Sequence, residues 1–284
     1  MSFNAPKFSK DIIRAVRASE PIEICGLTLY PITMRDYDEF ILCKDALAIQ
    51  HSSLPAQYLA MDFVSALFAL TLDEAKKAAE GKQPMSENTA AFQRVLRLLY
   101  LALRIPDGEE NDISKDIAYI EQDDNIIIDH ITIHQNGENI TLTPAVFSSR
   151  IRPVLAYQNG IELPDERTNP DLIKEFKKYH NKSESDVHLK ANADDLIASV
   201  AYLSHISEAE IIDWTVRQFE ARVRAIERDK RYDQYGQAEM SGFVSFKNGN
   251  PAPSWCYDVE VDLPGSSSLS EVGKTLDGAG VKQK

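Results

Sequence analysis

The stretch Ser207–Ile226, SEAEIIDWTVRQFEARVRAI, indicates a mainly helical fold because its apolar residues recur with a helical period. Their spacing alternates between four and three positions, which places them in one narrow line along a helix. Ser207, with Glu210 three residues later, has the capping-box pattern that starts a helix. The pattern predicts one long, charged helix from Ser207. Its apolar residues, here called the apolar stripe, are Ile212, Val216, Phe219, Val223 and Ile226.

A stripe this narrow fits two kinds of packing partner. One is a second chain, because this spacing is the geometry of a coiled coil. The other is the helix predicted over Ala193–Ser204, where Leu196, Val200 and Leu203 share one face. The stripe spans only about two heptads, and a coiled-coil prediction needs about three or four. Packing within the chain is therefore favoured, and self-association stays open.

A second sector of the same helix carries arginines, at Arg217, Arg224, Arg228 and Arg231. Such a row fits either the binding of an anion or a partner, or ordinary ion pairs along the helix. Acidic residues precede three of these arginines by four positions, namely Asp213, Glu220 and Glu227. That order is the favourable one for helix ion pairs, so we favour the second interpretation.

Residues 241–263, here called the aromatic arm, combine aromatic residues with Pro251 and Pro253 in a segment otherwise poor in core-forming side chains. The pattern fits a hairpin that packs back on the protein. It fits equally an extended arm, stiffened by proline, that presents aromatic anchors to a partner. The candidate anchors are Phe243, Phe246, Trp255 and Tyr257.

The first half of the chain predicts a helical lobe over residues 1–105 with a short β element at 22–32, where apolar residues alternate around Gly26. Within this lobe we expect a helix over 34–50. A core helix should begin near Pro55 and a separate short helix should cover Asp73–Gly81. The polar run at 106–112 is the best candidate for a boundary.

After this boundary the sequence predicts a β-hairpin insert over residues 113–143. Asn136-Gly137 between two β-type runs is a strong hairpin signal, because both turn positions need a positive φ. Residues 144–240 predict a C-terminal helical region, in which Pro153 should kink or split a helix. The Gly/Ser-rich residues 264–284 should be disordered. The fold class is therefore α+β, predominantly α-helical, with a small antiparallel sheet and a disordered C-terminal tail.

Composition excludes several classes of protein. The net charge of −13 is unsuited to nucleic acid, which needs clustered Lys and Arg. Three scattered cysteines indicate a reducing compartment. The N-terminus lacks the apolar run of a signal peptide. The most apolar segment, Tyr58–Leu72, is too short and too polar to span a bilayer. We therefore expect a cytoplasmic protein that binds neither nucleic acid nor membrane.

The sequence shows no catalytic or cofactor-binding signature. His130 and His134 would lie on one face of a strand but roughly 13 Å apart, too far to share a metal ion. The chain has no GxSxG, P-loop or GxGxxG motif. We therefore expect a protein that is not an enzyme and has neither metal nor cofactor, while an enzyme of unrecognised class remains an alternative.

Three segments together resemble the tail assembly chaperones of long-tailed phages and prophages of Gram-positive bacteria. They are Ile22–Phe40 (IEICGLTLYPITMRDYDEF), Ala193–Ile226 (ADDLIASVAYLSHISEAEIIDWTVRQFEARVRAI) and Ser241–Asp258 (SGFVSFKNGNPAPSWCYD). The resemblance implies an acidic, helical protein of the bacterial host cytoplasm. It would bind the long tape-measure protein, keep it soluble, and help recruit tail-tube protein.

The resemblance also implies that the protein is not retained in the finished virion. The alternative in the same setting is a structural protein of the phage tail or baseplate. In either case we expect the apolar stripe and the aromatic arm to carry the partner contacts.

Overall fold

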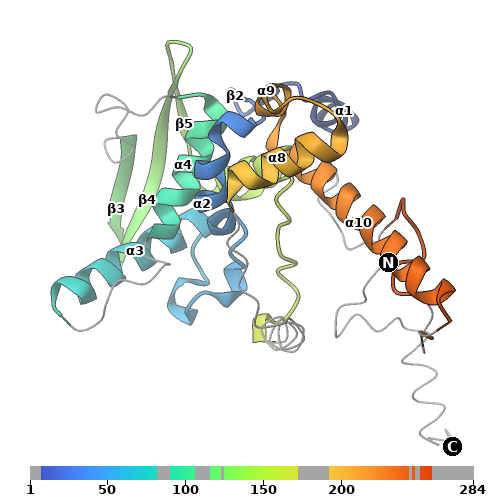
Figure 1. Ribbon diagram of the computed structural model, residues 1–284. Helices are drawn as coiled ribbons and strands as arrows, with labels where there is room; N and C mark the ends of the chain where they lie inside the picture. The colour runs from blue at the N-terminus through green and yellow to red at the C-terminus, as the bar shows by residue number, and fades with distance from the viewer. Residues whose placement is uncertain are drawn as a thin grey trace, which may run out of the picture. The chain divides into compact units, whose positions relative to one another are not determined.

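The computed structural model describes residues 8–81, 90–105, 116–122, 125–171, 192–242, 245–246 and 250–257. These residues form a mostly helical α+β fold with one two-stranded and one three-stranded antiparallel sheet, which confirms the predicted fold class (Figure 1). The chain divides into two compact units. The first comprises Met1–Glu166 and Ala191–Ala221, and the second comprises Arg167–Lys190 and Arg222–Lys284. The predicted boundary at 106–112 and the predicted disordered tail lie outside the described residues.

The short β element predicted at 22–32 is a hairpin of β1 (Ile22–Ile24) and β2 (Leu27–Leu29). Its two-residue turn places Cys25 at a φ of 53° and Gly26 at 84°. Both values lie in the left-handed region that tight hairpin turns require. Ile22, Leu27 and Leu29 are buried and Ile24 is half-buried, so one face of this small hairpin packs against the core.

The β-insert is also confirmed, with three antiparallel strands in the order β3-β4-β5. They are β3 (Ile117–Gln122), β4 (Asn125–Gln135) and β5 (Glu138–Leu142). The predicted Asn136-Gly137 turn joins the last two strands, with φ values of 54° and 80°. Helix α3 (Phe63–Ala79) packs against β4 (Figure 1). This packing supplies the helical cover that a sheet of three strands needs to be stable.

The helices of the first half differ from expectation in their bounds, and α2 is shorter than the helix expected over 34–50. The core helix begins at Phe63 and not near Pro55, and Asp73–Gly81 is not a separate helix, because α3 continues to Ala79. Tyr58 is buried and donates its hydroxyl to Asp73 at 2.8 Å, which holds the preceding turn against α3. The other helical elements here are α1 (Lys10–Ala18), α2 (Tyr37–Leu47), α4 (Ala91–Leu103) and the 3₁₀ turns Met34–Asp36, His51–Ser53 and Ala56–Tyr58.

Pro153 does not split the helix, because the helical backbone continues from Pro144 to Asn159 with a change of helix type. A short helix α5 (Pro144–Val146) leads into a π-helical turn (Phe147–Ile151), and α6 (Arg152–Asn159) follows. The wider π turn ends two residues before the proline, which has no N–H to donate and whose ring crowds the preceding turn. Thr143 caps α5 by accepting from the N–H of Val146, at the start of the predicted helical region 144–240.

Arg152, at the start of α6, is a buried cation that joins this helix to the end of α2. It donates to the carbonyls of Leu47 at 3.1 Å and Ile49 at 2.7 Å. Its guanidinium also lies 3.6 Å from the ring centre of Phe63. Burial lowers the pKa of Arg152 to about 10, so the side chain stays charged near neutral pH. A charged donor at the carboxyl end of a helix is favourable for both groups.

The C-terminal helices are α8 (Ala193–Ser204), α9 (Glu208–Ile212) and α10 (Val216–Met240). The predicted capping box of Ser207 and Glu210 is present at α9. The single long helix predicted from Ser207 is wrong, because the chain leaves the helix between Ile212 and Val216. Thr215 there forms an antiparallel bridge with Thr33, which requires an extended backbone.

Thr215 also caps the new helix. Its hydroxyl accepts from the N–H of Gln218 at 3.2 Å, and its own N–H donates to the Gln218 side chain at 2.9 Å. This is a second capping box, in the sequence TVRQ, and it was readable from the sequence. Two capping boxes only eight residues apart indicate two helices and not one.

The segment Leu27–Met34 is held on several sides by polar groups of the surrounding elements. Buried Gln135 of β4 accepts from the N–H of Thr28 and donates to its carbonyl, both at 2.9 Å. From α6, Gln158 donates to the carbonyl of Leu29 at 3.0 Å. Asn159, next to it, accepts from the N–H of Ile32 at 2.9 Å. The backbone N–H of Tyr30 donates to the carbonyl of Ala102, and that of Met34 donates to the carbonyl of Trp214. The carbonyl of Ile32 accepts from the N–H of Val216.

We predict that Gln135→Ala destabilises the protein by about 2–4 kcal/mol, because it leaves the N–H and the carbonyl of half-buried Thr28 without their side-chain partner. Chemical denaturation of the two proteins measures this difference in the free energy of unfolding. Gln57→Ala is the matched control, since Gln57 is exposed and makes one long side-chain bond, to Asp73 at 3.4 Å. A loss at Gln135 no larger than at Gln57 would contradict this role.

Candidate partner-binding surface

The structure distributes the five residues of the apolar stripe over different environments. Val216 and Phe219 are fully buried in the core of the first unit, where Phe219 meets Tyr37 edge-on with ring centres 5.6 Å apart. Ile212 is half-buried and belongs to α9, so it does not continue the line of α10. The first half of the stripe is therefore a packing surface within the chain.

The second half of the stripe, Val223 and Ile226, lies on the part of α10 that belongs to the second unit. Both side chains are half-buried. The prediction that α8 packs through Leu196, Val200 and Leu203 is wrong in part. Leu203 is 39 % exposed and Leu196 is half-buried, whereas the fully covered side chains are Ile197, Val200 and Ala201.

The arginine row does not start with the predicted ion pair. Asp213 lies outside α10 and pairs with Arg35 at 2.6 Å. Arg217 stacks on the ring of Tyr157 and donates to its carbonyl. The break before α10 removes Asp213 from the helical position that would have faced Arg217, so the i,i+4 argument fails at this pair.

The described part of the aromatic arm packs back along α10. Phe246 meets Tyr235 edge-on with ring centres 5.5 Å apart. Asn250 donates to the carboxylate of Glu239 at 3.2 Å. Arg228 donates through Nε to the carbonyl of Trp255 at 3.0 Å. Of the two conformations compatible with the sequence, the packed one is therefore observed in this part of the arm, while Phe243 lies outside the described residues.

Two aromatic side chains of the arm nevertheless face the solvent. Trp255 is 62 % exposed and Tyr257 is 77 % exposed. The hydroxyl of Ser254 accepts from the N–H groups of Cys256 and Tyr257, which forms a local turn that fixes the backbone between them. The arm thus holds two large aromatic side chains in an exposed position, on either side of this turn.

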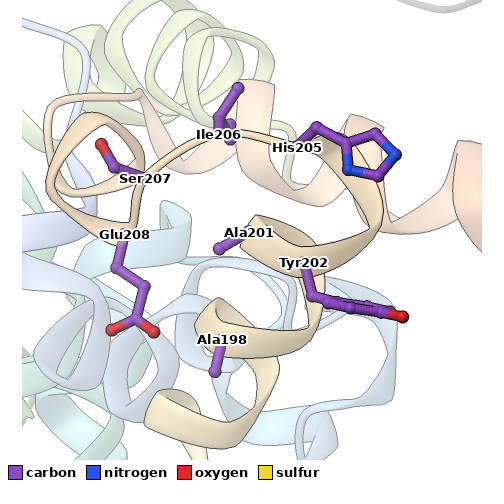
Figure 2. Close-up of a pocket in the computed structure, with 7 residues that line it drawn as sticks. All are labelled: Ala198, Ala201, Tyr202, His205, Ile206, Ser207 and Glu208. Atoms are coloured by element: carbon purple, nitrogen blue, oxygen red, sulfur yellow. The ribbon is translucent and has the colours of Figure 1, made fainter.

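A shallow, open depression of about 510 Å³ lies between α8 and the start of α9. Figure 2 shows Ala198, Ala201 and Glu208 around its centre, while Tyr202 and His205 point to one side. The hydroxyl of Ser207 at its rim is engaged with Glu210 in the capping box. The lining therefore offers a small apolar surface and an exposed carboxylate, and its serine serves a structural role.

The two histidines of β4 each lie beside an acidic residue. His130 contacts Asp129 at 2.7 Å. His134 places one ring nitrogen 2.7 Å from the amide oxygen of Asn139 and the other 3.2 Å from Asp116. Within the described residues, no cluster of three or more His, Cys, Asp or Glu side chains could hold a metal ion. His134 thus links β4 to β5 through Asn139, whereas His130 contacts its neighbour on the same strand.

We predict that the pKa of His134 lies above its usual value of about 6.5. The hydrogen bond with Asn139 is the larger cause and the contact with Asp116 adds to it, since both oxygens favour the doubly protonated ring. The resulting stabilisation is complete below pH 6.5 and is lost as the pH rises through the higher, folded value. Titration of His134 by NMR measures this. Asn139→Ala should lower the pKa, and an unchanged value would contradict the cause given.

We also predict that Phe246→Ala loosens the aromatic arm, because an edge-to-face aromatic pair contributes about 0.5–1.5 kcal/mol beyond burial. Cleavage by chymotrypsin after Trp255 should then be faster by about threefold to tenfold. Tyr232→Ala is the matched control, since Tyr232 is an exposed tyrosine of the same helix. Equal cleavage rates in the two variants would show that the contact with Tyr235 does not hold the arm.

Comparison of the chain with known protein families, with characterised proteins and with solved structures gave no match. No helix within the described ranges has both the length and the apolar character needed to cross a membrane.

Proposed function

We propose that this protein is a non-catalytic tail assembly chaperone of a long-tailed phage or prophage, which binds the tape-measure protein in the cytoplasm of the bacterial host. The observation that carries the proposal is the pair of exposed aromatic side chains, Trp255 and Tyr257, on an arm that is itself held along α10. The resemblance of the sequence to such chaperones supports the same reading.

The chemistry of the partner fits these side chains. A tape-measure protein is a long helical chain with exposed apolar faces, so it needs apolar contacts until the tail tube covers it. Tryptophan and tyrosine bury a large area at a small entropic cost, because each has only two side-chain torsions. The net charge of −13 would keep the complex of the two proteins in solution. The same complex could then help to recruit tail-tube protein.

Burial narrows the set of residues that can make this contact. Val216 and Phe219 are part of the core, so a partner could reach them only if the first unit opened. The proposed contact therefore rests on Trp255 and Tyr257, together with the half-buried Val223 and Ile226 of the same unit. No catalytic role is assigned to any residue.

We predict that the double variant Trp255→Ala, Tyr257→Ala binds the tape-measure protein of the same phage at least about 30-fold more weakly, since each exposed aromatic anchor contributes about 1–2 kcal/mol. The measurement is co-expression of the two proteins, followed by gel filtration of the soluble complex and titration of the purified components. Solubility of the tape-measure protein should fall in the same variant.

The matched control is Tyr202→Ala, which removes an aromatic side chain that is also 77 % exposed but lies on α8 in the other unit. It should bind as the unaltered chain does. If the unaltered chain neither forms a complex nor changes the solubility of the tape-measure protein, the proposal is wrong. Retention of the chain in purified virions would favour a structural tail or baseplate protein instead.

A further inference from the structure

The β3 strand is the outer edge of the three-stranded sheet (Figure 1). Among the residues that the structure describes, its only strand partner is β4, with Ile117 opposite Ile131 and Gln122 opposite Asn125. In an edge strand, alternate residues direct their N–H and C=O groups away from the sheet. These groups form a ready template on which another strand can pair.

Within the described part of the chain, β3 lacks the residues that usually protect an edge. Its sequence, IAYIEQ, contains no proline and no lysine, and Glu121 is its one charged residue. The ladder has an irregularity, but the extra residue is Asp129 on β4, because Ala118 pairs with His130 and Tyr119 with Ile128. The strand β3 therefore keeps a regular extended course along its free side.

Apolar side chains are exposed on both faces of this edge. Tyr119 is 65 % exposed and Ile120 is 47 % exposed, although neighbouring residues of a strand point to opposite faces. Ile126, opposite Glu121 on β4, is 40 % exposed. An extended, apolar edge with a free backbone is a surface on which a further strand would bury both side chains and pair its main chain.

We propose that β3 pairs with β3 of a second copy of this chain, antiparallel, with Tyr119 opposite the same tyrosine of the other copy. This joins the two sheets into one of six strands, as β5-β4-β3 followed by the same three strands in reverse. A two-fold axis perpendicular to the sheet keeps each face on the same side in both copies, so directly opposed residues share a face.

The strand is its own complement in this register. Tyr119 stacks against its counterpart, and the small Ala118 lies opposite the large Ile120. Ile117 lies opposite Glu121, so the one charged residue of β3 never faces its own copy. Like charges directly opposed would be destabilising, whereas aromatic pairs across strands are among the favourable ones. This self-complementarity identifies the second strand as another β3.

The net charge sets the expected response of this dimer to salt. Each chain carries a net charge of −13, so two copies repel each other and salt screens the repulsion. The dimer should therefore strengthen between 50 and 500 mM salt, about tenfold in its dissociation constant as an order of magnitude. A contact with a basic partner would respond to salt in the opposite direction.

The test is sedimentation velocity of the full chain across a range of concentrations. The unaltered chain should dimerise, and Tyr119→Lys should weaken the dimer at least about 30-fold, because it removes the central aromatic pair and places two like charges in contact. Tyr202→Lys is the control, since it adds the same charge at another exposed tyrosine, on α8. It should leave the dimer unchanged.

A cross-link tests the register itself. Opposed residues in an antiparallel ladder have Cα atoms about 4.5–5.5 Å apart, within the range that a disulfide spans. Tyr119→Cys should therefore form a disulfide-linked dimer under mild oxidation, whereas Tyr202→Cys should not. A chain that is monomeric at all concentrations would overturn the proposal. So would a dimer that Tyr119→Lys and Tyr202→Lys affect equally, or one that Tyr119→Cys fails to cross-link.

Discussion

The first unit depends on hydrogen bonds from buried side-chain amides of β4 and α6 to the backbone of the segment Leu27–Met34. An extended segment in the core must have its N–H and C=O groups satisfied, because an unpaired backbone group in a buried site costs about as much as a lost hydrogen bond. A sheet would satisfy them with further strands. Here Gln135, Gln158 and Asn159 supply the donors and acceptors from a strand and a helix. Each amide reaches its backbone partner only when its own strand or helix is correctly placed, so the three hydrogen bonds together fix how β4 and α6 lie against the segment.

The same segment also sets where the C-terminal helices begin. Thr33 bridges Thr215, and this pairing holds the backbone before α10 in an extended state. The helix that would otherwise run on from Ser207 therefore restarts at Val216, with Thr215 as its cap. Phe219 enters the core as a consequence. The bridge at Thr33 thus decides which residues of the apolar stripe are buried.

Local sequence patterns predicted which helices and strands form better than they predicted the residues at which these elements begin and end. The Asn136-Gly137 turn and the Ser207 capping box depend on neighbouring residues, and each was readable from the sequence. The break at 213–215 depends on Thr33, which lies far away along the chain. The apolar period alone could not show it, since Ile212 and Val216 fit the same period on one helix or on two.

The candidate partner-binding surface was predicted only in part, because long-range packing decides which apolar side chains are covered. Sequence periodicity identifies apolar side chains but not the elements that cover them, so it grouped buried Phe219 with exposed Trp255. The exposed edge at β3 was missed because a short Ile-rich strand looks the same at the centre of a sheet and at its edge. The distinction comes from strand order, which the spacing of apolar residues does not contain.

Native-state hydrogen exchange of the Ile32 and Val216 amides tests the central role of this segment most directly. Ile32 donates to Asn159, and Val216 donates to the carbonyl of Ile32, each at 2.9 Å. If the amide contacts hold the first unit together, both N–H groups should exchange only through global unfolding, with the free energy found for core helices such as α4. Exchange of either amide at a clearly lower free energy, through local opening, would contradict the account.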